Sequence, residues 1–298
     1  MKKKLLFVFN PCSGKAQIKN QLLDIVDTMV KADYEVTIYP TQCAGDAKEK
    51  VEAYAENYDL VVCSGGDGTL DEVVTGMMQC KAKVPLGYIP AGSTNDFASS
   101  LGLPKDLLDA ARLAATGEPR KLDIGSFNGR CFSYVASFGA FTRTSYATPQ
   151  GMKNALGHVA YLLAGAKELT SIRSTHMRFV LADGTSFEDD YIFGAISNST
   201  SVAGLLTLSP DLVDLNDGLF ELLLIRKPHS LLELSDCVLA LTTQEYHTPM
   251  LTMVSTGRVE IDCPSELDWT LDGEYAAGQA HCVVENLHDA IRVIVRPK

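Results

Sequence analysis

The sequence lacks several features that would assign it to other classes of protein. Its eight cysteines include no Cys-x-x-Cys pair and no Cys/His cluster, which argues against a zinc site or disulfide framework and favours a reducing compartment. No apolar run approaches the roughly 20 residues that a membrane-spanning helix needs. The apolar stretch that follows three lysines ends at Asn10-Pro11, too soon for a signal peptide.

The chain also lacks the basic excess of a nucleic-acid-binding protein, since its formal net charge is −11. A cationic stretch does occur at residues 127–179, where six basic residues face the single acid Glu168. Such a stretch favours contact with anionic lipid, although solvated helix and strand faces explain it equally well. We therefore expect a cytoplasmic protein that binds no nucleic acid and contacts membranes peripherally.

The composition is that of a globular protein, with 46% apolar and 21% charged residues, and a length of 298 suits two domains. Within residues 1–125, strand and helix patterns alternate, which predicts an α/β domain with a mostly parallel sheet covered on both faces. The expected strands are 4–9, 34–39, 60–63 and 85–89. The expected helices are 17–31, 47–56, one that runs to Met78, and 107–116.

Residues 126–287 change to alternating strand patterns, which predicts an antiparallel, sandwich-like second domain rich in β-structure. The expected strands are 130–138, 176–181, 191–197, 219–225, 256–261 and 280–285, and the expected helices are 157–170 and 230–243. A last strand at 290–295 is predicted to return to the first domain, so that residues 288–298 rejoin it.

The most informative stretch is Ser64-Gly65-Gly66-Asp67-Gly68-Thr69, which joins a short apolar strand to the start of a helix. Glycines let the backbone approach a ligand closely, and a helix N-terminus favours a phosphate. Asp67 would repel that phosphate unless a cation stood between them. The stretch therefore predicts a nucleotide site that works with a divalent metal; the plainer alternative is a tight turn with an exposed aspartate.

Other polar groups gather at turns. Two more loops follow predicted strands, at 10–15 and 91–96, and ligands of parallel sheets bind at such ends. Carboxylates recur around Asp214 and Asp217 and around Gly273. They would supply oxygen ligands for Mg²⁺ and a general base if they faced the first-domain loops. Taken singly, each Asp-Gly turn is explained as a hairpin connection.

In this order, the motifs resemble those of the diacylglycerol kinase catalytic family, specifically its soluble bacterial lipid kinases. The matching segments are Asn10-Pro11-Cys12-Ser13-Gly14, Thr41 with Gly45-Asp46-Ala47, the signature Gly65-Gly66-Asp67-Gly68-Thr69, Gly92-Ser93-Thr94-Asn95-Asp96-Phe97-Ala98, and Leu271-Asp272-Gly273-Glu274. The signature alone is shared with NAD kinases, whereas the whole set is far more specific.

The resemblance implies an NAD kinase/phosphofructokinase-like first domain, ATP as phosphate donor, Mg²⁺, and a lipid alcohol such as diacylglycerol as acceptor. The residues that would bind nucleotide are Asn10, Pro11, Ser13, Gly14, Thr41, Gly65, Gly66, Asp67, Gly68, Thr69, Gly92, Ser93 and Asn95. Asp214, Asp217 and the carbonyl of Leu219 would bind the metal, with Asp67, Asp96 and Asp123 in a supporting water network. Glu274, or Asp272 beside it, would take the acceptor proton.

Three positions depart from the family pattern: Ser93 replaces threonine, Ser99 stands where many members have arginine, and Asn216 stands where many have aspartate. With these departures we still expect a kinase, but the identity of the acceptor stays open. The alternatives are an NAD kinase acting on a soluble acceptor and a silent nucleotide- or lipid-binding relative. Aromatic residues that would contact a bilayer, or form core instead, are Phe138, Phe141, Tyr146, His158 and Tyr161. A homodimer is possible because symmetric pairs are common.

Overall fold

A computed structural model describes residues 2–14, 16, 18–93, 95–139, 173–199, 201–202, 206–207, 214–243, 245–246 and 248–297. The chain divides into two compact units, Met1–Ile124 with His288–Lys298, and Gly125–Leu287. The predicted helix at 157–170 lies outside the described residues, as do Phe141, Tyr146, His158 and Tyr161.

The first unit is built on a parallel sheet. Its strands are β1 (Lys3–Phe9), β2 (Tyr34–Pro40), β3 (Leu60–Gly65) and β4 (Leu86–Pro90), paired in the order β2-β1-β3-β4. The end of β17 (His281–Val295) pairs in parallel with β4 through Val293. Every residue of β3 and β4 is buried. A strand covered on both faces reads as a continuous apolar run, which is why the sequence revealed these two.

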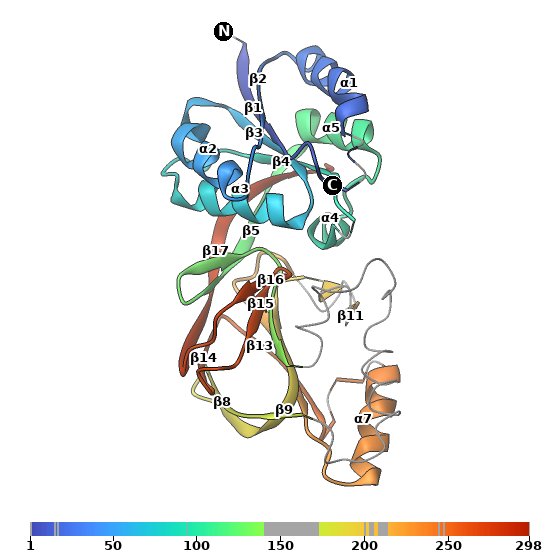
Figure 1. Ribbon diagram of the computed structural model, residues 1–298, viewed down its shortest axis with the longest axis vertical. Coiled ribbons are helices and arrows are strands. Elements are labelled where there is room, and N and C mark those ends of the chain that lie inside the picture. The colour runs from blue at the N-terminus through green and yellow to red at the C-terminus, as the bar shows by residue number, and fades with distance from the viewer. Residues whose placement is uncertain are drawn as a thin grey trace. The chain divides into compact units, whose positions relative to one another are not determined.

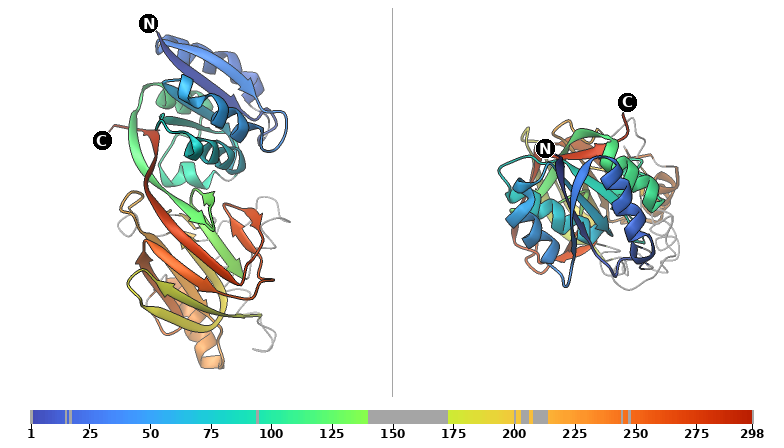
Figure 2. Two further views of the ribbon diagram at one scale, coloured as in Figure 1. Left: turned by 90° about the vertical axis from the view of Figure 1, so that its left-hand side faces the viewer. Right: turned by 90° about the horizontal axis from the view of Figure 1, so that it is seen from above.

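Helices cover both faces of this sheet. Figure 1 and the view from above in Figure 2 show α2 (Asp46–Tyr54) and α3 (Asp67–Gln79) on one side and α1 (Ile18–Lys31) and α5 (Leu107–Thr116) on the other. Alternate residues of β1, such as Phe7, pack in one buried cluster with Ile25 of α1. The predicted α/β fold is confirmed. The other elements of this unit are η1 (Ala55–Asn57), α4 (Asp96–Ser100) and the first part of β5, a strand that spans Glu118–Phe127.

The second unit is antiparallel in all its described pairings, as the sequence predicted. Its strands include β8 (Thr175–Leu181), β9 (Ser186–Ser197), β12 (Phe220–Arg226), β13 (Leu251–Thr256), β14 (Arg258–Asp262), β15 (Trp269–Leu271) and β16 (Glu274–Ala276). A two-stranded ribbon pairs β10 (Ser201–Val202) with β11 (Leu206–Thr207), and α7 spans Leu231–Thr243.

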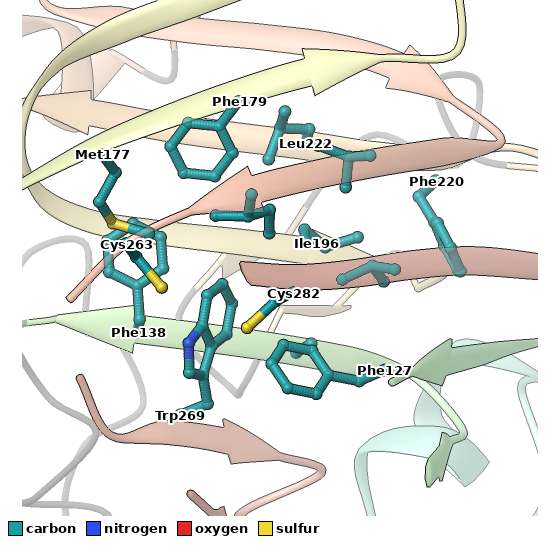
Figure 3. Packing of buried hydrophobic residues seen from close by; sticks show 14 of the residues in the cluster. Phe127, Phe138, Met177, Phe179, Ile196, Phe220, Leu222, Cys263, Trp269 and Cys282 are labelled. Atoms are coloured by element: carbon teal, nitrogen blue, oxygen red, sulfur yellow. The ribbon is translucent and has the colours of Figure 1, made fainter. Parts of the chain in front are cut away.

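The core of this unit is aromatic. Trp269 is fully buried, and its ring centroid lies 4.9 Å from that of Phe127 and 5.0 Å from that of Phe138 (Figure 3). Both ring pairs are tilted, with interplanar angles of 52° and 59°, and aromatic pairs typically add about 0.5–1.5 kcal/mol each beyond the area that they bury. Phe138 is therefore a core residue, and the suggestion that it contacts a bilayer is wrong.

Three predicted strand boundaries are wrong. The segment at 130–138 is broken into β6 (Arg130–Phe132) and β7 (Val135–Gly139). The segment at 256–261 breaks at Gly257, between β13 and β14. The segments at 280–285 and 290–295 instead form the single strand β17, in which Asp289 adopts a left-handed φ of 54°. The break between β6 and β7 is caused by a distant contact, which is described with the site.

Candidate functional site

Three loops of the first unit meet at the carboxyl ends of β1, β3 and β4. The N–H of Asn10 donates to the carbonyl of Ser64 at 2.9 Å, and the N–H of Ala91 donates to that of Gly65 at 2.8 Å. Asn10 Nδ2 also donates to Thr69 Oγ1 at 3.3 Å. The segments at 10–14, 64–69 and 91–95 are thus hydrogen-bonded to one another in the same order as β1, β3 and β4. This edge is where parallel sheets bind their ligands.

Glycines make the contact between these loops possible. A Cβ on Gly14, whose φ is +54°, would lie 2.3 Å from the carbonyl oxygen of Ala91. A Cβ on Gly92 would lie 2.5 Å from Gly66 Cα and 2.8 Å from Asn95 Oδ1. Backbone, which cannot move aside easily, occupies the space in both cases. The close approach therefore requires glycine at both positions.

Asp67 is the first residue of α3, after the N-cap Gly66, and its carboxylate turns to the neighbouring loop. Its Oδ2 accepts the N–H of Asn95 at 2.9 Å, while Oδ1 is buried with no hydrogen-bond partner among the described residues. Burial raises the pKa of Asp67, and hydrogen bonds from the backbone of Asn95, Phe97 and Asp96 partly oppose the rise. Burial therefore disfavours the charged form of this carboxylate. A cation near it would stabilise the charged form.

Asn95 shapes the third loop from within. Its φ of 54° is left-handed, a region that asparagine tolerates better than most residues. Its Oδ1 accepts the N–H of Gly92 at 3.0 Å, and its Nδ2 donates to the carbonyl of Gly92 at 2.9 Å. Asn95 therefore closes the loop upon itself. Asp96 beside it is buried, whereas Ser93 is exposed.

The loop after β2 is held by an internal carboxylate. Glu72 of α3 accepts the N–H groups of Gly45 at 2.7 Å and Ala47 at 3.2 Å, at the start of α2. This helix N-terminus is thus already capped by a negative group. Thr41 stays close to β1, since its N–H donates to the carbonyl of Phe9 at 2.9 Å. No local pattern marked Glu72, which lies 27 residues beyond Gly45.

Asp123 has a fully buried side chain near the end of the first unit's β5 segment. Its Oδ1 accepts His288 Nδ1 and the N–H of Asp289, both at 2.9 Å. Lys121 forms a short ion pair with Asp289. Asp123 therefore ties β5 to the last part of the chain, and these contacts hold its carboxylate in one orientation.

In the second unit, the segment at 214–219 forms a tight loop before β12. Asp214 Oδ1 accepts the N–H of Asn216 at 3.1 Å, and Asp217 Oδ1 accepts the N–H of Leu219 at 2.9 Å. Both aspartates are exposed. Side chains that bond the backbone two residues ahead form Asx turns, which explains why this acidic sequence curls.

The oxygen atoms of the loop at 214–219 are suitable ligands for a small hard cation. The described residues contain no group of three or more His, Cys, Asp or Glu side chains able to hold a metal. Mg²⁺ usually takes one or two carboxylates from a protein and keeps several waters. The loop offers the carboxylates of Asp214 and Asp217 and the carbonyl of Leu219. The buried Oδ1 of Asn216 has no hydrogen-bond partner among the described residues. The donor set is therefore all oxygen.

Glu221, two residues beyond Leu219, is a buried acid. Burial, followed by the charge of Asp217, raises its pKa from an ordinary 4.5 to about 8. Because the folded-state pKa is raised, the stability contributed by the neutral carboxyl is fully present below about pH 4.5 and is lost as pH rises through about 8. No local sequence pattern marked Glu221 as a buried acid.

We expect Glu221→Gln to remove that loss of stability. In chelator-treated protein, the melting temperature of Glu221→Gln should match wild type at the acid end and exceed it increasingly up to about pH 8, then by a constant amount. Thermal melting across about pH 5 to pH 9 measures this. Glu266→Gln, at an exposed glutamate, is the matched control. A constant difference between Glu221→Gln and wild type over the whole range would contradict the assignment.

Asp272 and Glu274 lie in the hairpin that joins β15 to β16, so the hairpin explanation of this Asp-Gly turn is confirmed. Asp272 and Gly273 have φ values of 50° and 88°, and a two-residue type I′ hairpin turn requires a positive φ at both positions. The two acids differ sharply. Asp272 is buried and accepts backbone N–H groups from Ser133, Tyr134 at 3.0 Å and Val135 at 2.9 Å, whereas Glu274 is exposed.

These bonds explain the break between β6 and β7. Ser133 and Tyr134, the two residues between β6 and β7, donate to a carboxylate 139 and 138 residues away instead of to a neighbouring strand. Val135, which also donates to Asp272, is the first residue of β7 and pairs with Ser197. The N–H of Asp272 donates in return to the carbonyl of Val135 at 2.9 Å. Asp272 thus fixes the hairpin, and this hairpin carries Glu274 with its side chain exposed to solvent.

Comparison with known proteins follows the same division. The Diacylglycerol kinase catalytic domain family matches residues 4–127, and the YegS C-terminal NAD kinase beta sandwich-like domain family matches residues 135–295. A diacylglycerol kinase from Bacillus subtilis (strain 168) is 34% identical over 295 residues, which cover 98% of this chain and 96% of that protein. The chain belongs to the diacylglycerol kinase family. It is thus an enzyme of a kinase family, and the general activity supported is that of a lipid kinase.

Other members agree with this assignment. A diacylglycerol kinase from Staphylococcus aureus (strain bovine RF122 / ET3-1) is 35% identical over 278 residues, covering 92% of this chain and 87% of that protein. A crystal structure of a diacylglycerol kinase from Bacillus anthracis str. Sterne has a TM-score of 0.74 at 22% identity, covering 99% and 98% of the two chains. A second structure from that strain has a TM-score of 0.82, also at 22% identity, covering 99% and 96%. These structures share the fold.

One position that departs from the pattern of the diacylglycerol kinase family contacts the third loop. Ser99, where many members have arginine, donates its hydroxyl to the carbonyl of Asn95 at 3.1 Å and so supports that loop.

Within the described part of the chain, every helix is too short or too polar to cross a bilayer.

Proposed function

We propose that the protein transfers the γ-phosphate of Mg-ATP to the hydroxyl of diacylglycerol or a related long-chain lipid alcohol, giving phosphatidic acid or its analogue. One observation carries the nucleotide half of this proposal. The loops at 10–14, 64–69 and 91–95 converge through glycine contacts, with a partly buried Asp67 among them. Backbone amides and a helix N-terminus are the groups that bind phosphates.

The proposal assigns the two carboxylates of the hairpin different parts. Asp272 accepts three backbone N–H groups within the second unit, and the proposal therefore makes it a positioning residue. Glu274 has an exposed carboxylate and takes the proton of the acceptor hydroxyl. Asp214, Asp217 and the Leu219 carbonyl hold Mg²⁺, and Asp67, Asp96 and Asp123 support it through water. When bound, the ion supplies charge neutralisation on the phosphates.

We propose further that the enzyme is cytoplasmic and meets its acceptor at a membrane surface, because the acceptor is a lipid. The homodimer stays a prediction. Neither proposal depends on Phe138, which belongs to the core.

The acceptor is tested by competition. Labelled Mg-ATP is offered to the protein with diacylglycerol in anionic mixed micelles and NAD in the same tube. We expect label in phosphatidic acid and none in NADP. Label in NADP alone would overturn the proposal in favour of an NAD kinase, and label in neither, from protein that binds ATP, would indicate a catalytically silent relative or a different lipid alcohol.

Asp67→Asn tests the role of the buried charge. The variant keeps an acceptor for the Asn95 N–H but carries no charge, so we expect phosphate transfer to fall by about 10²-fold. Because the folded-state pKa of Asp67 is raised, the stability of its neutral form is lost as pH rises. The melting temperature of metal-free Asp67→Asn should therefore equal or exceed that of wild type at neutral pH. Asp109→Asn, on the exposed face of α5, is the control.

Gly92→Ala tests the loop contact. The added methyl group would lie 2.5 Å from Gly66 Cα, so the two loops must separate. We expect ATP to bind at least about tenfold more weakly, and stability to fall by about 1–3 kcal/mol. Calorimetric titration with ATP measures the first effect. Gly102→Ala is the control for ATP affinity, since Gly102 has no atom within 4 Å of an added Cβ. Gly102 has a positive φ of +63°, which Gly92 does not share, so only the ATP affinities of the two variants are compared. Unchanged ATP affinity in Gly92→Ala would contradict the proposed nucleotide site.

A further inference from the structure

The carbonyl of Leu219 has a partner that no motif of the sequence indicated. Asn286 of β17 donates from Nδ2 to Leu219 O at 2.8 Å. The backbone N–H of Asn286 donates to the carbonyl of Gly257, also at 2.8 Å. One residue therefore connects the loop at 214–219 with the turn between β13 and β14. Only the NH₂ group of an asparagine can face a carbonyl oxygen favourably, so the amide orientation is fixed by its chemistry.

Gly257 allows the loop to come this close. A Cβ on Gly257 would lie 2.9 Å from the carbonyl oxygen of Gly218. The segment of Gly218 and Leu219 is thus packed against a turn that has no room for a larger residue. The registered pairing of β14 with β17 ends at Arg258 and Glu285, and the bond from the Asn286 N–H to the Gly257 carbonyl adds one contact beyond it. The Leu219 carbonyl is thus supported from the end of a paired region rather than from within its own loop.

Asn286 also carries an unsatisfied oxygen. Its Oδ1 is buried and has no hydrogen-bond partner among the described residues, as is also true of Asn216 Oδ1 in the loop itself. A buried acceptor left without a partner costs about 1–3 kcal/mol. Two such oxygens occur where two carboxylates and a carbonyl already gather. A hydrated cation brings water molecules whose hydrogens can satisfy such acceptors.

We infer that Asn286 is a positioning residue of the cation site, which orients the Leu219 carbonyl toward the ion and receives a water of its hydration shell on Oδ1. The inference rests on the proposed function, in which Mg²⁺ binds at 214–219. A carbonyl oxygen has two lone pairs, so Leu219 O accepts from Asn286 and still faces a cation. Partners that orient metal ligands typically change metal affinity by 10–100-fold when they are removed.

The test separates this role from that of a structural tie. A tie would lower the melting temperature of Asn286→Ala equally with and without Mg²⁺. A positioning role predicts that the Mg²⁺ concentration giving half of the thermal stabilisation rises by about tenfold. The matched control is Asn128→Ala, because Asn128 Oδ1 accepts the N–H of Val283 in the same strand at 2.7 Å and contacts no part of the loop in any described hydrogen bond. Its half-saturation should stay within about twofold of wild type.

The outcomes distinguish this inference from the function on which it rests. If Mg²⁺ stabilises neither wild type nor the variants, the proposed metal site fails and Asn286 has no such role. If wild type responds, Asp214→Asn does not, and Asn286→Ala titrates like wild type, only the inference about Asn286 is overturned.

A second measurement applies if Asn286→Ala does not fold. In wild type labelled with ¹⁵N at asparagine side chains, the Asn286 NH₂ resonances are identified by their absence from the isosteric Asn286→Asp. We expect them to shift with the same Mg²⁺ midpoint as the thermal stabilisation. Resonances that do not move while the protein is being stabilised would overturn the inference.

Discussion

Replacing Glu274 by glutamine is expected to lower kcat by about 10²–10⁴-fold, the usual contribution of a general base. The substitution keeps the size of the side chain and removes only its ability to take a proton. Glu274 is exposed on the β15–β16 hairpin, so the melting temperature should stay close to that of wild type. Initial rates of phosphate transfer at saturating ATP and acceptor measure the effect on kcat.

The control for this prediction is Glu266→Gln, at an exposed glutamate outside the proposed machinery, which should keep wild-type kcat. An effect of Glu274→Gln on KM alone, with kcat preserved, would show that Glu274 binds the acceptor without accepting its proton. Wild-type kinetics in the variant would remove Glu274 from the mechanism altogether.

Replacing Asp272 by alanine is expected to destabilise the second unit by about 3–5 kcal/mol. Three backbone N–H groups, those of Ser133, Tyr134 and Val135, lose the carboxylate that accepts them. Each buried donor left unsatisfied costs about 1–3 kcal/mol, and bonds to charged groups lie at the upper end. This loss is a large part of the stability of an ordinary domain.

Trp269 provides the measurement for Asp272→Ala. It is the single tryptophan of the chain, fully buried in the core of the second unit and three positions before Asp272. Its fluorescence during denaturant unfolding therefore reports on this unit. Asp268→Ala is an informative comparison, because Asp268 accepts the Tyr275 hydroxyl at 3.3 Å beside the same hairpin. A loss below about 1 kcal/mol in Asp272→Ala would contradict the positioning role.

The two substitutions together separate chemistry from support in one motif. Glu274→Gln should lose activity and keep stability, whereas Asp272→Ala should lose both, since the hairpin that carries Glu274 is no longer fixed. Sequence reasoning left open which of the two acids is the base. The contacts of Asp272 favour Glu274, because a carboxylate that already accepts three donors has little capacity left for a substrate proton.

Features that depend on local pattern were predicted well. Strands β3 and β4 were recognisable because strands buried on both faces are continuously apolar. The glycine turn at 65–68 was recognisable because a strand, a glycine pair and a helix start follow one another directly. The convergence of the three first-unit loops also follows from topology, since the carboxyl ends of parallel strands share one edge.

Features that depend on distant partners were not predicted. The break between β6 and β7 is caused by Asp272, and the capping of α2 by Glu72 joins residues that no periodicity connects. Asn286 supports Leu219 across 67 residues. The raised pKa of Glu221 comes from burial, which a strand pattern alone does not reveal for a glutamate beside an acidic loop. The first three are long-range polar contacts and the last is a consequence of tertiary burial, and both leave little trace in local sequence.

If the protein is the proposed lipid kinase, it couples ATP consumption to phosphorylation of a lipid alcohol. The most direct test is the ratio of phosphatidic acid formed to ADP released, measured in one reaction with Mg-ATP and diacylglycerol in anionic mixed micelles. We expect a ratio near one in wild type, with both products lost together in Glu274→Gln. ADP released without phosphatidic acid, at a rate that diacylglycerol does not change, would contradict it.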